Sequence, residues 1–239
     1  MASYVIADIH GEYDLFLRML ERIRLQEEDT LYILGDVVDR GPHPVKVLCK
    51  LMEMPNVIPI VGNHELMALD GLRFLNREIT EESVRNIDRE TLAGLADWMR
   101  NGSEPTMREF REQDPETRQE IIDFILQFSL YEEVEAGGER YLLVHAGLGD
   151  YVPGKDIEDY SLKNLVWDRA EYDIRYFEDR YVVSGHTPTQ LIEGNPRPGY
   201  IYRANGHIAI DCGCCFTGGR LAAIRLDDGE EFYVERDET

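Results

Sequence analysis

The stretch GDVVDRG, residues 35–41, directly follows an apolar segment, residues 30–34, that predicts a β-strand. Asp36 is the first charged side chain past that strand, so we expect it to point into the crevice where open α/β folds place their ligands. Asp39 and Arg40 follow within one turn. A carboxylate suits a divalent cation, and the guanidinium fork of Arg40 matches a phosphate. The stretch therefore indicates metal and phosphate, although Asp-Arg-Gly also occurs as an ordinary solvated turn.

Three strand–helix units precede and follow this stretch. Each has a short apolar run, a turn with glycine, and then apolar residues at the spacing of one helix face. The predicted strands are 3–9, 30–34 and 57–61, and the predicted helices are 13–24, 45–52 and 64–72. Units of this length predict parallel strands joined by right-handed crossovers, which indicates an α/β fold.

A charged helical insertion occupies about residues 73–128, with predicted helices at 81–100, 104–112 and 115–128. Its charge is more typical of a solvated face than of a binding surface. The insertion nevertheless leaves one strand end and returns near another, so it could cover the site. Four of its residues could contact a substrate, although roles in the core or in helix caps are at least as common: Trp98, Asn101, Gly102 and Thr106.

Strands resume after the insertion, at 140–144 and 180–184. The last segments, 208–210, 220–226 and 231–234, alternate with glycine-rich turns and predict antiparallel strands. The sequence contains no internal repeat, low-complexity segment or linker rich in proline and serine. We therefore expect one domain over residues 1–239.

The composition limits the partners and the compartment. The formal net charge is -22 and the pI is near 4.6, so the phosphates of a nucleic acid or an anionic membrane would be repelled. The start of the chain lacks a basic region with an apolar stretch, and no segment reaches the roughly 18 apolar residues of a membrane span. The four cysteines form no disulfide framework for this length. We expect a cytoplasmic protein that binds neither nucleic acid nor membrane.

Metal-competent side chains lie at the ends of five of the predicted strands. They are Asp8, His10, Asp36, Asn63, His64, His145 and His186. Alternate residues of an extended chain share a side, so Asp8 and His10 can bind one cation, whereas adjacent residues diverge and leave His64 to face a substrate. The donors exceed what one ion needs, which indicates two ions bridged by Asp36. The expected ligand groups are Asp8 with His10, and Asn63 with His145 and His186.

Five motifs in this order resemble the phosphoprotein phosphatase family of dimetal serine/threonine phosphatases, most of all its small bacterial and bacteriophage lambda type. The motifs are Asp8-x-His10, Gly35-Asp36-x-x-Asp39-Arg40-Gly41, Gly62-Asn63-His64-Glu65, His145-Ala146-Gly147 and Gly185-His186-Thr187-Pro188. The resemblance implies the metallophosphoesterase (calcineurin-like) fold, a β-sandwich flanked by helices. It also implies two divalent transition-metal ions, manganese with iron or zinc as alternatives.

The resemblance assigns roles residue by residue. It implies metal ligation by Asp8, His10, Asp36, Asn63, His145 and His186. It makes His64 the acid for the leaving oxygen, Asp39 the residue that orients His64, and Arg40 a phosphate clamp. Val166-Trp167-Asp168-Arg169 resembles the segment that carries a second phosphate arginine, which implies the same role for Arg169.

The implied activity is that of a serine/threonine protein phosphatase whose nucleophile is a water that bridges the two metals. The alternatives are hydrolysis of diadenosine polyphosphates or other small phosphoesters, and a metal-bearing binding module without catalysis. Related enzymes that cut diadenosine tetraphosphate symmetrically usually lack the equivalent of Asp39, which favours the phosphatase. The partner is a phosphorylated protein or peptide, or a small phosphoester. The oligomeric state stays open.

Overall fold

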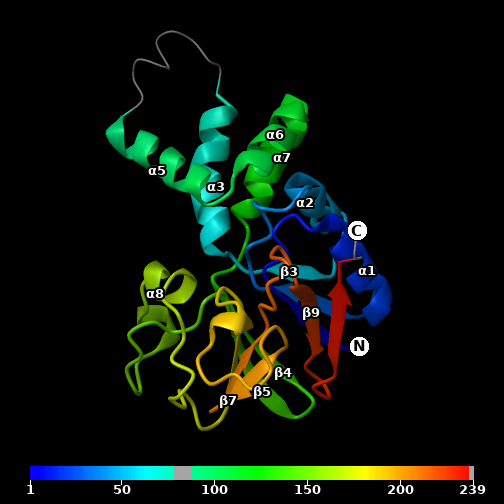
Figure 1. The fold of residues 1–239 in the computed structure, drawn as a ribbon, viewed down its shortest axis with the longest axis vertical. Coiled ribbons are helices and arrows are strands. Elements are labelled where there is room, and N and C mark those ends of the chain that lie inside the picture. Colours follow the sequence, from blue (N-terminus) through cyan, green and yellow to red (C-terminus); the bar gives the residue numbers. More distant parts are fainter. Residues whose placement is uncertain (78–87, 237–239) are drawn as a thin grey trace.

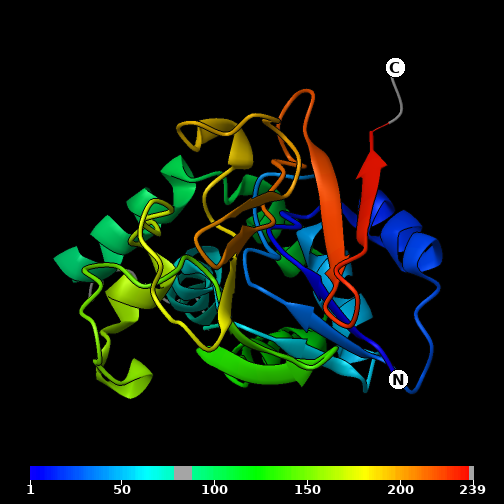
Figure 2. The same ribbon diagram turned by 90° about the horizontal axis from the view of Figure 1, so that it is seen from below.

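The computed structural model describes residues 1–77 and 88–236, which form two five-stranded sheets with helices packed on the outside (Figure 1 and Figure 2). The first sheet has the strand order β10-β9-β1-β2-β3, and the second has the order β4-β5-β6-β8-β7. The strands are β1 (Ser3–Ile6), β2 (Thr30–Ile33), β3 (Val57–Pro59), β4 (Tyr131–Ala136), β5 (Glu139–Val144), β6 (Tyr181–Ser184), β7 (Tyr202–Ala204), β8 (His207–Ala209), β9 (Arg220–Arg225) and β10 (Glu231–Glu235). The expected β-sandwich flanked by helices is confirmed.

The first sheet contains the three expected strand–helix units. β1 pairs parallel with β2, from Ser3 opposite Thr30 to Ile6 opposite Ile33, and β2 pairs parallel with β3. The units end in α1 (Tyr13–Ile23), α2 (Pro44–Met52) and α3 (Asn63–Leu75). The antiparallel strands β9 and β10 complete the sheet, with β9 beside β1. Figure 2 shows α1 beside β10 on the outer face of this sheet.

The second sheet differs from the expectation in two ways. β8 pairs parallel with β6, although the C-terminal strands were expected to be antiparallel. The edge strands β4 and β7, which pair antiparallel with β5 and β8, lie where the sequence predicted no strand. β4 reads YEEVEA and carries three glutamates, so an apolar pattern could not reveal it. An edge strand can leave one of its faces exposed to solvent, so it can carry charged residues. Charged residues on an edge strand also discourage pairing with other chains.

Apolar residues form three layers because successive side chains of a strand point to opposite faces. Tyr4 and Ile6 of β1 belong to the layer beneath the helices, whereas Val5 lies in the layer between the two sheets. The third layer covers the outer face of the second sheet, where Leu142 and Val182 pack with residues of the short helix α8 (Leu162–Val166).

The helical segment 89–125 consists of α5 (Arg89–Arg100), α6 (Glu104–Glu112) and α7 (Pro115–Ile125). Figure 1 shows these helices gathered with α3 at one end of the molecule. The predicted helix 81–100 lies partly outside the described residues, and the predicted helix 115–128 ends at Ile125. Trp98, Phe110 and Ile121 are fully buried in the layer that also holds β1, so the segment is part of the main core rather than a solvated addition. Within the described residues, every helix is too short or too polar to cross a membrane.

Candidate metal centre and active site

The loops after β1 and β2 run side by side beyond the ends of their strands. The amide of Asp8 donates to the carbonyl of Gly35 at 3.2 Å, and the amide of His10 donates to the carbonyl of Asp36 at 2.8 Å. β1 ends at Ile6, and Asp8 and His10 have φ values of 51° and 45°. The extended alternation expected for these two residues is therefore wrong, since backbone bonds to the neighbouring loop set their directions instead.

Left-handed backbone is concentrated in this region. Nine non-glycine residues of the described chain have positive φ, and six of them are residues that the sequence assigned to the site: Asp8, His10, Asp36, Asp39, Arg40 and His186. Such conformations cost about 1–3 kcal/mol each and persist where the surrounding structure enforces them. The fold therefore holds these side chains in directions that local sequence preference would not select.

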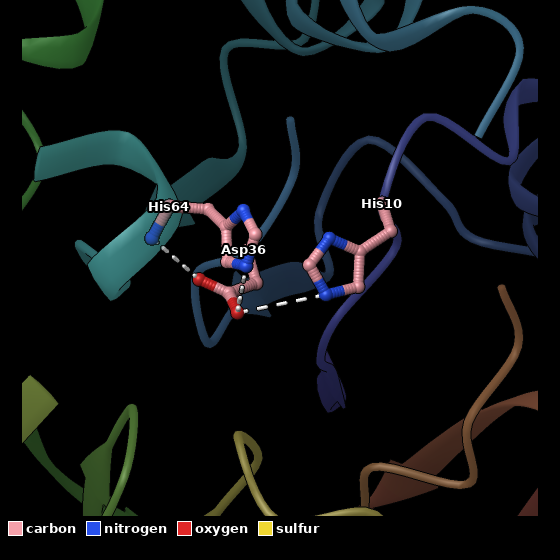
Figure 3. A group of neighbouring side chains, drawn as sticks. All are labelled: His10, Asp36 and His64. Carbon is pink, nitrogen blue, oxygen red and sulfur yellow. Dashed lines mark hydrogen bonds and ion pairs between the residues drawn. The ribbon is translucent and has the colours of Figure 1, made fainter. Parts of the chain in front are cut away.

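Asp36 lies at the centre of two groups of potential ligands. Its Oδ2 is 3.6 Å from Nε2 of His10, and its Oδ1 is 3.4 Å from Nε2 of His145. Figure 3 shows His10 and His64 with their rings turned toward the Asp36 carboxylate. The potential ligand atoms of His10, Asp36 and His64 lie within 4.8 Å of one another, as do those of Asp36, His145 and His186. Each carboxylate oxygen thus faces a different histidine, which is the geometry of a bridging ligand.

Hydrogen bonds to backbone carbonyls orient two of the buried histidines beside Asp36, His10 and His145. Nδ1 of His10 donates to the carbonyl of Val38 at 2.9 Å, and Nδ1 of His145 donates to the carbonyl of Leu34 at 2.6 Å. Both Nε2 atoms are then left with a lone pair that points toward Asp36. Metal-binding histidines in proteins are usually fixed in this way. Burial lowers the pKa of both imidazoles, which favours the neutral, ligating form.

Asn63 brings a third kind of donor atom to the same place. Its Oδ1 lies 3.0 Å from Nε2 of His145 and 2.9 Å from Nδ1 of His186. The other ring nitrogen of His186 donates to the carbonyl of Trp167 at 3.0 Å. His145 and His186 each use their ring proton on a backbone carbonyl. The lone pairs of Nε2 of His145, Nδ1 of His186 and Oδ1 of Asn63 therefore face one another. Converging acceptors of this kind are stabilised by a cation.

Asp8 lies near the same centre, although its carboxylate is in neither of the two groups around Asp36. It accepts the amide of His186 at 3.0 and 2.9 Å, through one oxygen each. Burial raises its pKa strongly, and the neighbouring carboxylates of Asp211 and Asp36 raise it further. Burial likewise raises the pKa of Asp211 to about 7. Three buried carboxylates in one region call for positive charge, so the donor set fits divalent cations.

Glu65 holds the loop that carries Asp36. Its buried carboxylate accepts the amides of Asp36 at 2.7 Å, Val37 at 2.8 Å and Gly62 at 2.9 Å. Burial, with the nearby Asp36, raises the pKa of Glu65 to about 7. A side chain near the start of α3 therefore ties the strand ends of β2 and β3 together.

His64, Asp39 and Arg40 form a connected set beside the potential metal ligands. Nδ1 of His64 lies 2.7 Å from Oδ2 of Asp39. The exposed guanidinium of Arg40 reaches over to Nε2 of His64 at 2.9 Å and Nε2 of His10 at 2.7 Å. Burial lowers the pKa of His64, but the carboxylates of Asp36 and Asp39 outweigh burial and raise it overall. A phosphate held by Arg40 would lie next to Nε2 of His64.

Arg169 is less closely integrated. It is exposed and lines a hollow of about 450 Å³ with Tyr172 and Thr187, the residue after His186. The carbonyl of Trp167, two residues before Arg169, accepts a hydrogen bond from Nε2 of His186. The segment that carries Arg169 is therefore bonded to a potential metal ligand. The positive charge of Arg169 also contributes, after burial and other neighbours, to a His186 pKa of about 4.

Two residues that the sequence named only as possible substrate contacts lie against this set. Trp98 of α5 and Thr106 of α6 both bond to the Asp39 carboxylate. Asp211 was missed as a member of the buried carboxylates. The sequence alone could not predict these contacts. Trp98 and Thr106 lie about 60 residues from Asp39 in the chain. Asp211 follows β8, a strand that only a short apolar run indicates.

The comparisons with known proteins support this description. A family model described as calcineurin-like phosphoesterase matches residues 1–207. A symmetrical bis(5'-nucleosyl)-tetraphosphatase of Nitrosospira multiformis is 34% identical over 280 residues, which cover 98% of this chain and 96% of that protein. Serine/threonine-protein phosphatase 2 of Salmonella typhimurium is 31% identical over 172 residues, which cover 70% of this chain and 67% of that protein.

The fold has a close counterpart among solved structures. A crystal structure of a putative diadenosine tetraphosphatase superposes with a TM-score of 0.67 at 17% identity, and covers 97% of this chain and 92% of that chain. At 17% identity, this structural likeness shows the fold alone.

The match to the family model confirms the resemblance to dimetal phosphatases at the level of the family. The family implies a dinuclear divalent metal centre.

Proposed function

Because this chain belongs to the calcineurin-like phosphoesterase family and is a metallophosphoesterase, we propose that its substrate is a bis(5'-nucleosyl) tetraphosphate. The observation that carries the substrate class is the tetraphosphatase relative, which aligns over 98% of this chain, whereas the protein phosphatase relative aligns over 70%. A phosphoprotein, the substrate expected from the sequence, is therefore the second candidate. The negative net charge of -22 is no obstacle, since metals and arginines supply local positive charge.

Two divalent cations would be held by six residues. One would use Asp8, His10 and Asp36, and the other would use Asp36, Asn63, His145 and His186. When bound, such ions lower the pKa of a water molecule and neutralise charge on the phosphoryl oxygens. The mixed oxygen and imidazole donors suit manganese, with iron or zinc as alternatives. The ligands come from both sheets, so we propose that residues 1–239 act as one catalytic domain.

Four side chains would complete the active site. Arg40 binds the equatorial phosphoryl oxygens with its fork of donors, and Arg169 binds them from the opposite loop. The guanidinium of Arg40 donates to Nε2 of His64 in this structure, so we propose that Arg40 turns to the phosphate when substrate binds. A protonated His64 then donates its Nε2 proton to the departing oxygen. Asp39 accepts the Nδ1 proton at 2.7 Å and so keeps the ring in the orientation that presents Nε2 to the substrate.

A phosphoserine or phosphothreonine protein is the second candidate substrate, and the pair of Asp39 and His64 favours it. A serine alkoxide is a strongly basic leaving group that needs a proton in the transition state, whereas a nucleoside polyphosphate leaves with little help. An oriented acid therefore brings more benefit to a phosphomonoester.

The test compares kcat/KM for diadenosine tetraphosphate, a phosphoserine peptide and a phosphotyrosine peptide after reconstitution with manganese. We expect the dinucleotide to be hydrolysed with the highest kcat/KM. Product analysis distinguishes a symmetrical cut, which yields two molecules of ADP, from an asymmetrical cut, which yields AMP and ATP. A higher value for the phosphoserine peptide would replace the first candidate by the second. Inactivity on all substrates with metals bound would leave only a binding role.

A further inference from the structure

The Asp39 carboxylate receives hydrogen bonds from three directions, two of which come from the helical segment 89–125. Its side chain is fully buried. Besides His64, it accepts the indole N–H of Trp98, at 2.9 Å to Oδ2 and 3.1 Å to Oδ1. It also accepts the hydroxyl of Thr106, at 2.7 Å to Oδ1. Both oxygens therefore have donors, and the plane of the carboxylate is set by residues distant in sequence.

Thr106 holds the backbone of Asp39 as well as its side chain. The same hydroxyl that donates to Oδ1 accepts the amide of Asp39 at 2.9 Å. The amide of Arg40 in turn donates to the carbonyl of Gly102 at 2.9 Å. Asp39 and Arg40 have φ values of 70° and 67°, a conformation that costs energy and needs support. The helical segment supplies that support at two consecutive residues.

Trp98 is itself fixed by the helix that carries His64. Its ring is fully buried and lies against Gly71 of α3, where a Cβ atom would be 2.1 Å from Cζ3 of the indole. α3 begins at Asn63, so His64 occupies its first turn. Trp98 thus contacts both the helix of the proposed acid and the carboxylate that orients it.

We infer that Trp98 and Thr106 are positioning residues that hold the Asp39 carboxylate against Nδ1 of His64. The inference rests on the proposed role of His64 as the acid, which matters most for a basic leaving group such as a serine alkoxide. A carboxylate bonded only to His64 could rotate about its Cβ–Cγ bond and release the ring. With Trp98 and Thr106 in place, the acceptor is pre-oriented before substrate binds. The helical segment thereby acts in catalysis through Asp39 without touching the substrate.

The competing explanation is packing alone, because buried indole and hydroxyl groups need some partner. Substitutions that keep the shape and remove the donor separate the two. Thr106→Val is isosteric and lacks the hydroxyl, whereas Thr106→Ser keeps the hydroxyl and loses a methyl group. Trp98→Phe keeps an aromatic ring without the N–H. Phe110→Leu reduces packing in the same buried layer, at a side chain that has no hydrogen-bond donor to offer Asp39.

The readout is the ratio of kcat/KM for p-nitrophenyl phosphate to that for a phosphoserine peptide, at matched manganese content. The ratio measures acid assistance, since only the basic leaving group depends on it. His64→Asn, the reference for a lost acid, should raise the ratio most. Thr106→Val and Trp98→Phe should each raise it about 3- to 10-fold, as expected for one lost hydrogen bond. Thr106→Ser and Phe110→Leu should keep the wild-type ratio.

Two results would overturn the inference, and they are distinguishable. If His64→Asn raises the ratio while Thr106→Val matches Thr106→Ser, only the positioning role fails. If His64→Asn slows both substrates equally, the acid role in the proposed function fails, and the positioning role falls with it. Should Trp98→Phe not fold, the comparison of Thr106→Val with Thr106→Ser decides alone, because both changes are small and differ in the hydroxyl.

Discussion

The backbone of Gly185 lies so close to Asp8 that a Cβ atom at residue 185 would be 2.0 Å from Oδ2 of Asp8. The amide of the next residue, His186, donates to both oxygens of that carboxylate. The loops after β1 and β6, which belong to different sheets, therefore fit against each other at the proposed metal centre. Only a residue without a side chain leaves room for the carboxylate there.

Gly185→Ala should displace Asp8 and weaken manganese binding by about tenfold or more, because displaced ligands and their supports typically cost that much. Calorimetric titration of the chelator-treated protein with manganese measures the effect. Gly94→Ala is the matched control, since Gly94 lies in α5 with open space around it. Equal manganese affinity in Gly185→Ala and wild type would show that Asp8 is not a ligand.

Asp36→Asn should lose both metal ions, because each oxygen of Asp36 faces a different group of ligands. Elemental analysis should find two ions per chain in the wild type, and a single ion in fully active protein would contradict the bridge. A melting experiment gives a second readout. Manganese should raise the melting temperature of the wild type, since it binds the folded state and offsets repulsion among Asp8, Asp36 and Asp211. The rise should be smaller in Asp36→Asn.

Arg40→Ala should lower kcat/KM by roughly one to two orders of magnitude and retain the metals, because bonds from a charged donor to a phosphate are worth about 1.5–3 kcal/mol. Arg40→Lys should recover only part of the loss, since an ammonium group lacks the planar fork. Arg140→Ala, which removes an exposed partner of Asp179, serves as the control. Unchanged activity in Arg40→Ala would refute the clamp. Arg169→Ala tests the second arginine in the same way.

Glu65→Gln should lower the free energy of unfolding by about 1–3 kcal/mol, because the amide nitrogen of glutamine would face backbone N–H donors that now bond to a carboxylate. Urea titration in the presence of a chelator excludes a contribution from metal loss. Glu104→Gln, at an exposed residue of α6, is the control. If the midpoint of Glu65→Gln equals that of Glu104→Gln, the loop after β2 does not depend on Glu65.

Side chains at strand ends could be placed from sequence for a topological reason. Asp36 and Asn63 follow neighbouring parallel strands, and the carboxyl ends of such strands meet at one edge of the sheet. The family resemblance, which depends on the order of the motifs, then predicted that His145 and His186 lie at the same centre. The glutamate-rich edge strand β4 could not be predicted, because its pairing with β5 depends on the partner and not on its own apolar pattern.

The sequence by itself determined the strand–helix alternation and the chemistry available at each strand end, because apolar periodicity and residue type are local properties. Only the tertiary structure decided how those side chains are aimed. The left-handed backbone at Asp8, His10 and Asp39 is unfavourable locally, and it is stabilised by bonds to neighbouring loops and to the helical segment 89–125. Trp98 and Thr106 reach Asp39 across 59 and 67 residues, so their contacts exist only once the helices have packed on the sheet.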